Sequence, residues 1–292
     1  MSWATWEATW RLHAKSRAFA HSVETAKRLA REGAAKVAPR SNGVGGLFCA
    51  LSGGKDSVAM AGILVEAGID VPSVHTTTKL DYPDTLATVE AVAEHLNLEL
   101  EVVEPANCEW HVEQVCRRFG VAKPQPPVDG YDELSILEAV PASATLPEML
   151  DQYRRATASG NMGVAYTYEH EYAGSFCGLR SEESNARAMY RAVWGPVFQS
   201  RKDQTWRVCP LLGWSDLDVY AFIVDRGLPL HPWYRRAYEA QQGRVNPGTL
   251  RVDSCVPETS ILGFGSWAVY RRVYREHAEM VERYIPLLKQ YR

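Results

Sequence analysis

Residues 47–57 of this 292-residue chain read LFCALSGGKDS, and this stretch decides the fold. Its first five residues are apolar, as in a buried strand, and residues 58–64 have the apolar spacing of a helix. Between them, Gly53 and Gly54 can adopt backbone angles closed to other residues, so that main-chain N–H groups converge on an anion at the helix N-terminus. Lys55 adds a mobile cation. The stretch therefore predicts a strand, an anion-binding loop and a helix.

The loop is not of the Walker type, because that motif places four residues between its first glycine and the Gly-Lys pair. Here Gly53, Gly54 and Lys55 are contiguous. The string SGGKDS resembles the pyrophosphate-binding loop of the PP-loop ATP pyrophosphatases, which split ATP between its α and β phosphates. The resemblance implies that six residues hold the phosphates of an adenine nucleotide: Ser52, Gly53, Gly54, Lys55, Asp56 and Ser57. The alternative is a glycine turn that binds nothing.

A second motif, GSFCGLRSEESNAR, occupies residues 174–187. A short apolar strand ends in glycine, and the spacing of Ser181 and Ser184 predicts a capped helix with Arg187 two turns along it. Arg180 should lie near the anion loop, because ligands of parallel sheets bind at the carboxyl ends of the strands. The motif resembles the second signature of the phosphoadenosine-phosphosulfate (PAPS) reductase-like branch of PP-loop proteins. The resemblance implies nucleotide contacts for Gly178, Arg180 and Arg187; the alternative is a surface helix whose charges pair with one another.

Two later tracts resemble the same branch, PLLGWSDLDVY at residues 210–220 and LPLHPWY at 228–234. There the resemblance implies a wall of the site, and we expect His231 to pack or hydrogen-bond rather than act as a base. Many members also carry a Ser-Cys-x-x-Cys pair near Cys255, but Glu258 replaces the second cysteine here. One thiolate with one carboxylate cannot by itself hold an iron–sulfur cluster or close a zinc site. We expect no metal there, and Cys255 remains a candidate catalytic nucleophile.

Strands alternating with helices predict an α/β fold, a doubly wound parallel sheet of the Rossmann-like PP-loop type. The second strand is expected at residues 71–77. The loop that follows, residues 76–84, resembles the segment that holds the base and ribose in the superfamily. The resemblance implies nucleotide contacts for Thr76 and Asp81, and the alternative is a solvated turn.

We expect three parts in the chain. Residues 1–44 form a helical N-terminal arm, residues 45–235 the nucleotide-binding domain with an insertion or lid at 105–165, and residues 236–292 a helical C-terminal region. Trp3, Trp6 and Trp10 recur at helical spacing, so the arm is expected to dock on the main domain, or on a partner subunit in a homo-oligomer or larger assembly. The aromatic and basic residues of 266–292 suit nucleic acid or inward packing, and we favour inward packing.

The composition limits the class of protein to which the chain can belong. With 46% hydrophobic and 23% charged residues the chain has the composition of a soluble globular protein, and no apolar run approaches the ~20 residues of a membrane span. A net charge of −3 provides no general basic field for nucleic acid. The six cysteines include no Cys-x-x-Cys pair, which, without a secretory segment, predicts reduced thiols and a cytoplasmic location.

The resemblance spans about residues 45–260 and implies an enzyme that cleaves ATP, with Mg²⁺, between the α and β phosphates. The loop would hold the leaving pyrophosphate, and Lys55 and Arg180 would stabilise the developing charge. The adenylated substrate would then meet sulfide, a persulfide or an amine, in sulfur transfer or in nucleotide or nucleic-acid modification. Cys177 and Cys255 are weaker candidates for a protein thiol. The acceptor stays open.

Two other functions are weighed against this one. The first is reduction of phosphoadenosine or adenosine phosphosulfate, in which a cysteine attacks sulfur. The assimilatory reductases present that cysteine in a C-terminal Glu-Cys-Gly-type motif, and residues 286–292, PLLKQYR, contain no cysteine. The second is an ATP-binding subunit of a DNA-modification or defence complex, such as the sulfur-incorporating subunit of DNA phosphorothioation systems.

Overall fold

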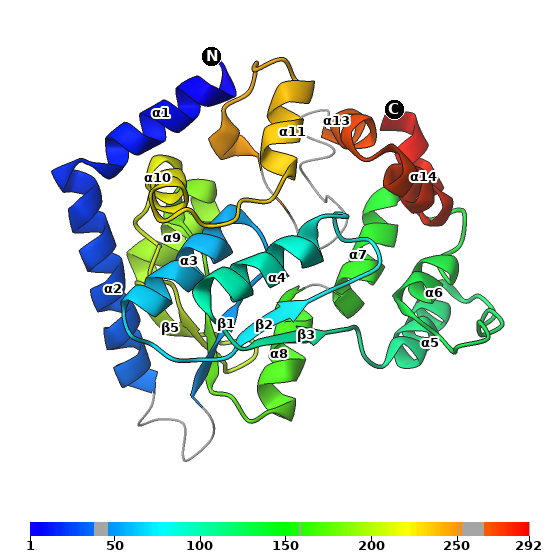
Figure 1. The fold of residues 1–292 in the computed structure, drawn as a ribbon. Coiled ribbons are helices and arrows are strands. Elements are labelled where there is room, and N and C mark those ends of the chain that lie inside the picture. The colour runs from blue at the N-terminus through cyan, green and yellow to red at the C-terminus, as the bar shows by residue number, and fades with distance from the viewer. Residues whose placement is uncertain (38–45, 158, 251, 253–265, 292) are drawn as a thin grey trace. The chain divides into compact units, whose positions relative to one another are not determined.

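The computed structural model describes residues 1–37, 46–157, 159–250, 252 and 266–291 (Figure 1). The chain divides into two compact units. The first contains residues 1–75, 84–102 and 163–252, and the second contains residues 76–83, 103–162 and 253–292. Each unit is described by itself.

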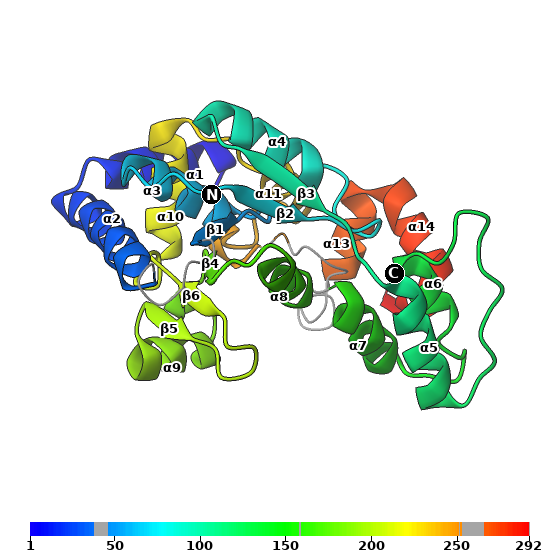
Figure 2. The same ribbon diagram turned by 90° about the horizontal axis from the view of Figure 1, so that it is seen from below.

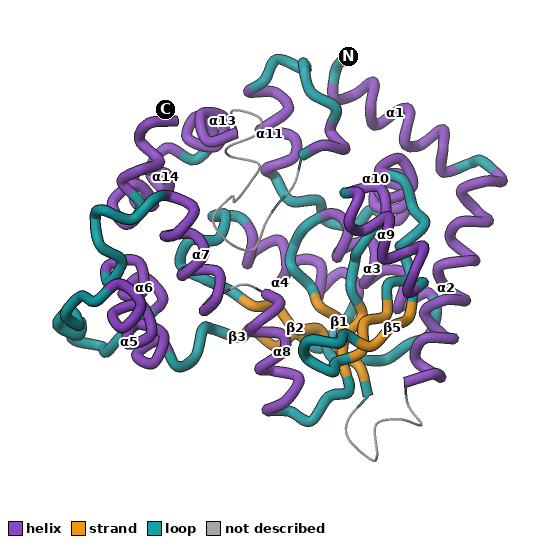
Figure 3. The backbone as a smooth tube through the Cα atoms, turned by 180° about the vertical axis from the view of Figure 1, so that it is seen from behind, coloured by secondary structure: helices purple, strands orange, loops and turns teal. Residues whose placement is uncertain are grey.

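A six-stranded sheet has the spatial order β3-β2-β1-β4-β6-β5. Figure 3 labels β3, β2, β1 and β5 of this sheet. The strands are β1 (Leu47–Ala50), β2 (Ser73–Thr76), β3 (Leu100–Val103), β4 (Gly174–Phe176), β5 (Val197–Gln199) and β6 (Trp206–Val208). β1 pairs in parallel with β2 and with β4, and β4 pairs in parallel with β6. The predicted Rossmann-like α/β fold is confirmed.

The expectation of an entirely parallel sheet is wrong at one edge. β5 runs antiparallel to β6, and no strand was expected at residues 197–199. The cause is the short connection between them. Residues 200–205 close a tight turn in which the Ser200 N–H donates to the Thr205 carbonyl at 2.9 Å. A parallel pair would require a crossover of a dozen or more residues.

Helices of the first unit cover both faces of the sheet, with α3 and α4 on one face and α8 on the other (Figure 2). The elements are α1 (Trp3–Ala14), α2 (Arg17–Val37), α3 (Lys55–Glu66), α4 (Thr85–Leu96), residues 163–169 of α8 (Ser159–Glu169), η2 (Ser181–Glu183), α9 (Asn185–Trp194), α10 (Asp216–Arg226), α11 (Trp233–Ala240) and η3 (Pro247–Thr249). This arrangement leaves the carboxyl ends of β1 and β4 to be filled by loops.

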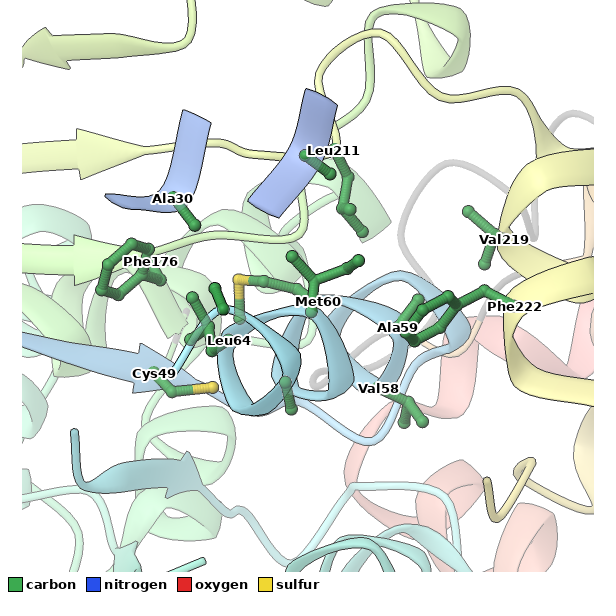
Figure 4. Close-up of a cluster of buried hydrophobic side chains, with 14 of the residues drawn as sticks. Ala30, Cys49, Val58, Ala59, Met60, Leu64, Phe176, Leu211, Val219 and Phe222 are labelled. Atoms are coloured by element: carbon green, nitrogen blue, oxygen red, sulfur yellow. The ribbon is translucent and has the colours of Figure 1, made fainter. Parts of the chain in front are cut away.

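Helix α3 lies at the centre of the hydrophobic core (Figure 4). Residues 58–64 of this helix are all buried, against Phe176 of β4 and Phe222 of α10 among others. At Gly62 a Cβ atom would lie 2.7 Å from the Phe222 ring, so the two helices pack this closely only because the residue is glycine. Because α3 is held on all sides, its N-terminus, where the anion loop ends, is fixed.

The N-terminal arm packs on the same unit. The Trp10 ring stacks on Tyr220 of α10 with centroids 4.3 Å apart, and Trp3 meets Tyr238 of α11 edge to face. His13 Nε2 lies 2.8 Å from Asp218 Oδ1. The tryptophan stripe therefore packs within the chain, and a role of the arm in binding a second subunit stays a prediction.

The second unit is helical. Its elements are α5 (Cys108–Phe119), α6 (Glu133–Glu138), α7 (Leu146–Thr157), residues 159–162 of α8, α13 (Ser266–Val273), α14 (Arg275–Tyr284) and η4 (Pro286–Tyr291). Trp267 and Tyr270 are buried, and the Trp267 indole donates to Glu282 Oε1 at 3.2 Å. These aromatic residues pack inward. Among the described residues, no helix combines the length and hydropathy that a membrane span requires.

We expect Phe176→Ala to lower the free energy of unfolding by about 3–5 kcal/mol, because it empties a site in the middle of the core. The measurement is urea unfolding followed by tryptophan fluorescence. Leu12→Ala is the matched control, since Leu12 is 72% exposed and its loss should change stability by less than about 0.5 kcal/mol. Equal midpoints for the two variants would contradict this description of the core.

Candidate functional site

The anion loop depends on its two glycines. Gly53 has a φ of +78°, and a Cβ atom there would lie 3.1 Å from Val89 Cγ2. Gly54 is the extended residue that precedes the first turn of α3. Within the part of the chain that the structure describes, the N–H groups of Gly53 and Gly54 have no hydrogen-bond partner. Together with the N-terminus of a 12-residue helix, they form a cradle suited to an anion.

Two hydroxyl groups and a phenol hold the loop in shape. Ser57 Oγ accepts from the Ser52 N–H at 3.2 Å and from Ser52 Oγ at 3.1 Å, and it donates to the Gly54 carbonyl at 2.9 Å. Tyr234 of α11 accepts from the Lys55 N–H at 3.0 Å. The Ser57 hydroxyl therefore shapes the loop, and Ser52, which is partly exposed, is the hydroxyl closer to solvent.

Two buried cations share two carboxylates beside the loop. Lys55 and Arg180 are each 1% exposed. Lys55 Nζ lies 3.0 Å from Asp56 Oδ2 and 3.4 Å from Asp216 Oδ1. Arg180 donates from Nε to Asp56 Oδ1 and from Nη2 to Asp216 Oδ1, both at 2.6 Å. Burial would by itself lower the pKa of Arg180, but the two carboxylates raise it above its ordinary value.

A close backbone approach brings Arg180 to the loop. A Cβ atom at Gly178 would lie 2.7 Å from the carbonyl carbon and oxygen of Asp56. Only glycine lets the segment after β4 pack directly on the first turn of α3. Glu182 then ties this segment to α10, because its Oε2 accepts from Arg180 Nη1 at 3.2 Å and from the Asp216 N–H at 2.8 Å.

The expectation that Ser181 opens a helix with Arg187 two turns along is wrong. Residues 181–183 form a 3₁₀ turn, and Ser184 is the N-cap of α9, its Oγ accepting from the Arg187 N–H at 3.2 Å. Arg187 therefore lies in the first turn. Its guanidinium pairs with Glu183, whose carboxylate also accepts from the Arg180 N–H. The surface-pairing alternative thus describes one of Arg187's contacts, and its role in nucleotide binding stays a prediction.

For three other expected site residues, a role in nucleotide binding or catalysis stays a prediction. Thr76 is the last residue of β2. Asp81 belongs to the second unit, where its carboxylate accepts from the Thr78 N–H and hydroxyl, both at 2.9 Å, and where burial raises its pKa to about 7. Cys255 lies outside the described residues. In the described ranges, no three His, Cys, Asp or Glu side chains are grouped as metal ligands.

Asp216 and Tyr234 lie in the two tracts expected to form a wall of the site, but their contacts with Lys55 were not predicted. The cap partner of Ser215 is not Asp216 but Asp218, which accepts from the Ser215 N–H at 2.9 Å. The Ser-x-x-Asp spacing of a capping box could have shown that Asp216 is free for another role. Tyr234 carried no comparable signal, because its contact with Lys55 joins residues 179 positions apart.

His231 is buried beside this site in a fixed tautomer. Its Nδ1 accepts from the Trp233 N–H at 3.1 Å, so the ring proton is on Nε2, which lies 3.2 Å from Thr85 Oγ1. Burial lowers the pKa of His231 to about 4. The side chain packs and hydrogen-bonds, as expected from the sequence.

We expect Gly178→Ala to weaken adenine-nucleotide binding at least tenfold while leaving a folded protein, because the added methyl group would push the loop away from Arg180. Isothermal titration with ATP measures the change. Gly46→Ala is the matched control, since no atom lies within 4 Å of a Cβ atom there. If both variants bound ATP equally well, the close approach would have no role in forming the site.

We expect His231 to make stability fall as the pH falls from about 6.5 to 4, by at most about 3 kcal/mol. The unfolded chain binds a proton on this residue below about pH 6.5, whereas the folded chain does not until about pH 4. Urea unfolding across this pH range should give a shallower slope for His231→Gln than for the exposed-residue control His95→Asn. The same slope in both variants would contradict a buried neutral imidazole.

Comparison with known proteins shows which family the chain resembles. A family model described as the phosphoadenosine phosphosulfate reductase domain matches residues 46–241. The phosphoadenosine 5'-phosphosulfate reductase of Xylella fastidiosa is 24% identical over 211 residues, 72% of this chain and 76% of that protein. The enzyme of the same name from Xanthomonas campestris is 27% identical over 185 residues, 63% of this chain and 64% of that protein, which is less than two thirds of its length.

Solved structures with a related fold are more distant. The phosphoadenylyl-sulfate reductase of Candida auris, solved as a phosphate complex, has a TM-score of 0.49 and 14% identity, and the match covers 79% of this chain and 94% of that one. The NMN synthetase of Francisella tularensis has a TM-score of 0.46 and 12% identity, with 92% of each chain covered. By the family model that covers more than half of it, the chain belongs to the phosphoadenosine phosphosulfate reductase domain family.

Proposed function

We propose that this protein is an enzyme that binds ATP, as its magnesium complex, and cleaves it between the α and β phosphates to adenylate an acceptor. The observation that carries the proposal is the convergence of an anion loop and two buried cations, Lys55 and Arg180, at the carboxyl ends of β1 and β4. β2 and β4 flank β1 on opposite sides, so this is the switch point where open α/β sheets bind ligands.

The loop residues divide the work of holding pyrophosphate. The N–H groups of Gly53 and Gly54 and the Ser52 hydroxyl donate to phosphate oxygens. The Lys55 ammonium exchanges its ion pair with one carboxylate for an ion pair with the phosphate, because a pyrophosphate group carries more negative charge than Asp56 or Asp216 alone. Fixed donors aimed at the place where charge develops are the main source of rate acceleration in such transfers.

Arg180 acts mainly by holding neighbouring carboxylates in position. Its Nε, Nη1 and Nη2 each donate to a carboxylate, namely those of Asp56, Glu182 and Asp216. With those donors engaged, the guanidinium holds Asp56 and Asp216 in place, and these in turn position the Lys55 ammonium. The positive charge of Arg180 remains close to the departing pyrophosphate. An acceptor oxygen then attacks the α-phosphorus from the side opposite the loop.

We expect Lys55→Ala to reduce pyrophosphate release from ATP by on the order of 10²–10³-fold, as for the loss of a charged transition-state donor. The measurement uses ATP labelled with ³²P at the γ-phosphate, which leaves in the pyrophosphate, with Mg²⁺ and a cell extract that supplies acceptors. Lys202→Ala, which removes an exposed lysine, is the matched control and should behave as wild type. ATP binding without pyrophosphate release by the wild type under any acceptor condition would refute the adenylating mechanism.

The second candidate is reduction of an adenylyl sulfate, with the loop holding the phosphate of the nucleotide. Two observations favour it. The related enzymes of Xylella fastidiosa and Xanthomonas campestris are named for this reaction. In addition Cys177, which is partly exposed, directly precedes Gly178, the residue that packs on the loop. Sulfite release from an adenylyl sulfate, tested with the same Lys55 and Lys202 variants, separates this function from adenylation.

A further inference from the structure

Two cysteines end adjacent parallel strands at the edge of the sheet that carries the anion loop. Cys177 follows β4 and Cys209 follows β6, and the register pairs Phe176 with Val208 immediately before them. The Cys177 N–H donates to the Val208 carbonyl at 2.8 Å, which continues the pairing by one step. Side chains at matching positions of neighbouring strands point to the same face, so the two thiols are side by side.

The spacing suits a disulfide. Neighbouring strands lie about 4.8 Å apart, inside the range of about 4.4–6.8 Å over which two cysteine Cα atoms can be bridged. Both thiols are reduced in this structure. Cys177 is partly exposed and Cys209 is fully buried, so an incoming molecule meets Cys177 first.

The surroundings distinguish the two thiols chemically. A hydrogen bond from the Cys209 thiol lowers the pKa of Cys177 to about 6, and the charges of Arg207 and Arg187 act in the same direction. The same hydrogen bond, together with burial, raises the pKa of Cys209 well above its ordinary value. Exposure and the direction of the two pKa shifts both favour Cys177 as the nucleophile of the pair and Cys209 as its hydrogen-bond donor.

We infer that Cys177 and Cys209 form a two-electron dithiol–disulfide couple that reduces a sulfuryl group carried by an adenine nucleotide in the anion loop. This inference rests on the second proposed function, adenylyl-sulfate reduction. Cys177 is the attacking thiol and Cys209 the resolving thiol. Gly178, the next residue, packs on Asp56, so Cys177 directly precedes the segment that contacts the anion loop.

The reaction balances in two steps. First the Cys177 thiolate attacks sulfur, the Sγ–S bond forms, and the S–O bond to phosphate breaks with its electron pair leaving on the nucleotide. Cys177 then carries an S-sulfonate. Next the sulfur of Cys209 attacks Cys177 Sγ, the disulfide forms, and sulfite departs with the electron pair of the Sγ–S bond and the proton of Cys209. An external dithiol reductant restores the couple.

The test follows a single turnover of the reduced full-length protein with phosphoadenylyl sulfate in the absence of any reductant. We expect one sulfite per chain and, in peptide mass spectra, a Cys177–Cys209 disulfide with the loss of two hydrogens. Cys209→Ser and Cys209→Ala should release no sulfite and should stall with one SO₃ group on Cys177. Cys177→Ser should give neither product. Cys116→Ser, which removes a buried cysteine of the second unit, is the control and should match wild type.

Several outcomes would overturn the inference. One is full sulfite release by Cys177→Ser, above all if Cys255→Ser then abolishes it. Another is sulfite release by the wild type with no Cys177–Cys209 disulfide. Titration with ADP, which has no sulfur to reduce, separates failure of the couple from failure of the nucleotide site. If Lys55→Ala weakens ADP binding but the wild type gives neither sulfite nor disulfide from phosphoadenylyl sulfate, the nucleotide site is supported and the dithiol couple is refuted. If the wild type does not bind ADP, both are refuted.

Discussion

The burial of two positive charges beside one loop constrains the rest of this unit. An ammonium or guanidinium group withdrawn from water is strongly destabilising unless carboxylates accompany it. Lys55 and Arg180 are both nearly inaccessible, and their partners Asp56 and Asp216 come from helices α3 and α10. Three segments that are distant in the sequence must therefore meet at one point. Removal of either carboxylate would leave each of the two buried cations with one partner fewer.

Hydrophobic packing makes that meeting point rigid. Helix α3 is enclosed by the sheet and by α10, and its close contact with Phe222 is possible because residue 62 is glycine. The same device recurs at Gly178, where backbone packs on backbone next to the ion pairs. The apolar core thus fixes the direction of the helix, and the glycines set how closely the polar segments approach it. Both the apolar core and the glycines are needed to place the two cations.

This arrangement prepares the site for an anion. The carboxylates balance the two cations in the resting protein, so the loop does not hold an excess of positive charge before a ligand arrives. A phosphate group can replace a carboxylate at Lys55 without reorganising Arg180, whose donors stay engaged. On the same edge of the sheet, the pairing of β4 with β6 brings two thiols together. The proposed phosphate-binding loop and the two thiols therefore lie at the same edge of the sheet.

The local features of this fold follow from short stretches of sequence. The apolar run before Ser52, the two glycines and the apolar spacing after them specify strand, loop and helix, because dihedral freedom and burial act on neighbouring residues. The packing of the N-terminal tryptophans could be predicted in the same way, since side chains at helical spacing share one face of a helix. From these elements the α/β class and the anion loop could be predicted without coordinates.

Tertiary structure decided which distant residues meet. The antiparallel edge strand β5 depends on a six-residue turn. The hydrogen bonds of this turn cannot be predicted from the hydrophobic periodicity of the sequence. The contacts of Asp216 with Lys55 and Arg180, of Tyr234 with the loop backbone, and of Cys177 with Cys209 join segments that are not neighbours in sequence. Sequence alone was enough to predict an anion-binding loop between β1 and α3. Only the packing of the sheet and helices could determine which charges and thiols surround that loop, because such pairings depend on distances in space rather than on spacing along the chain.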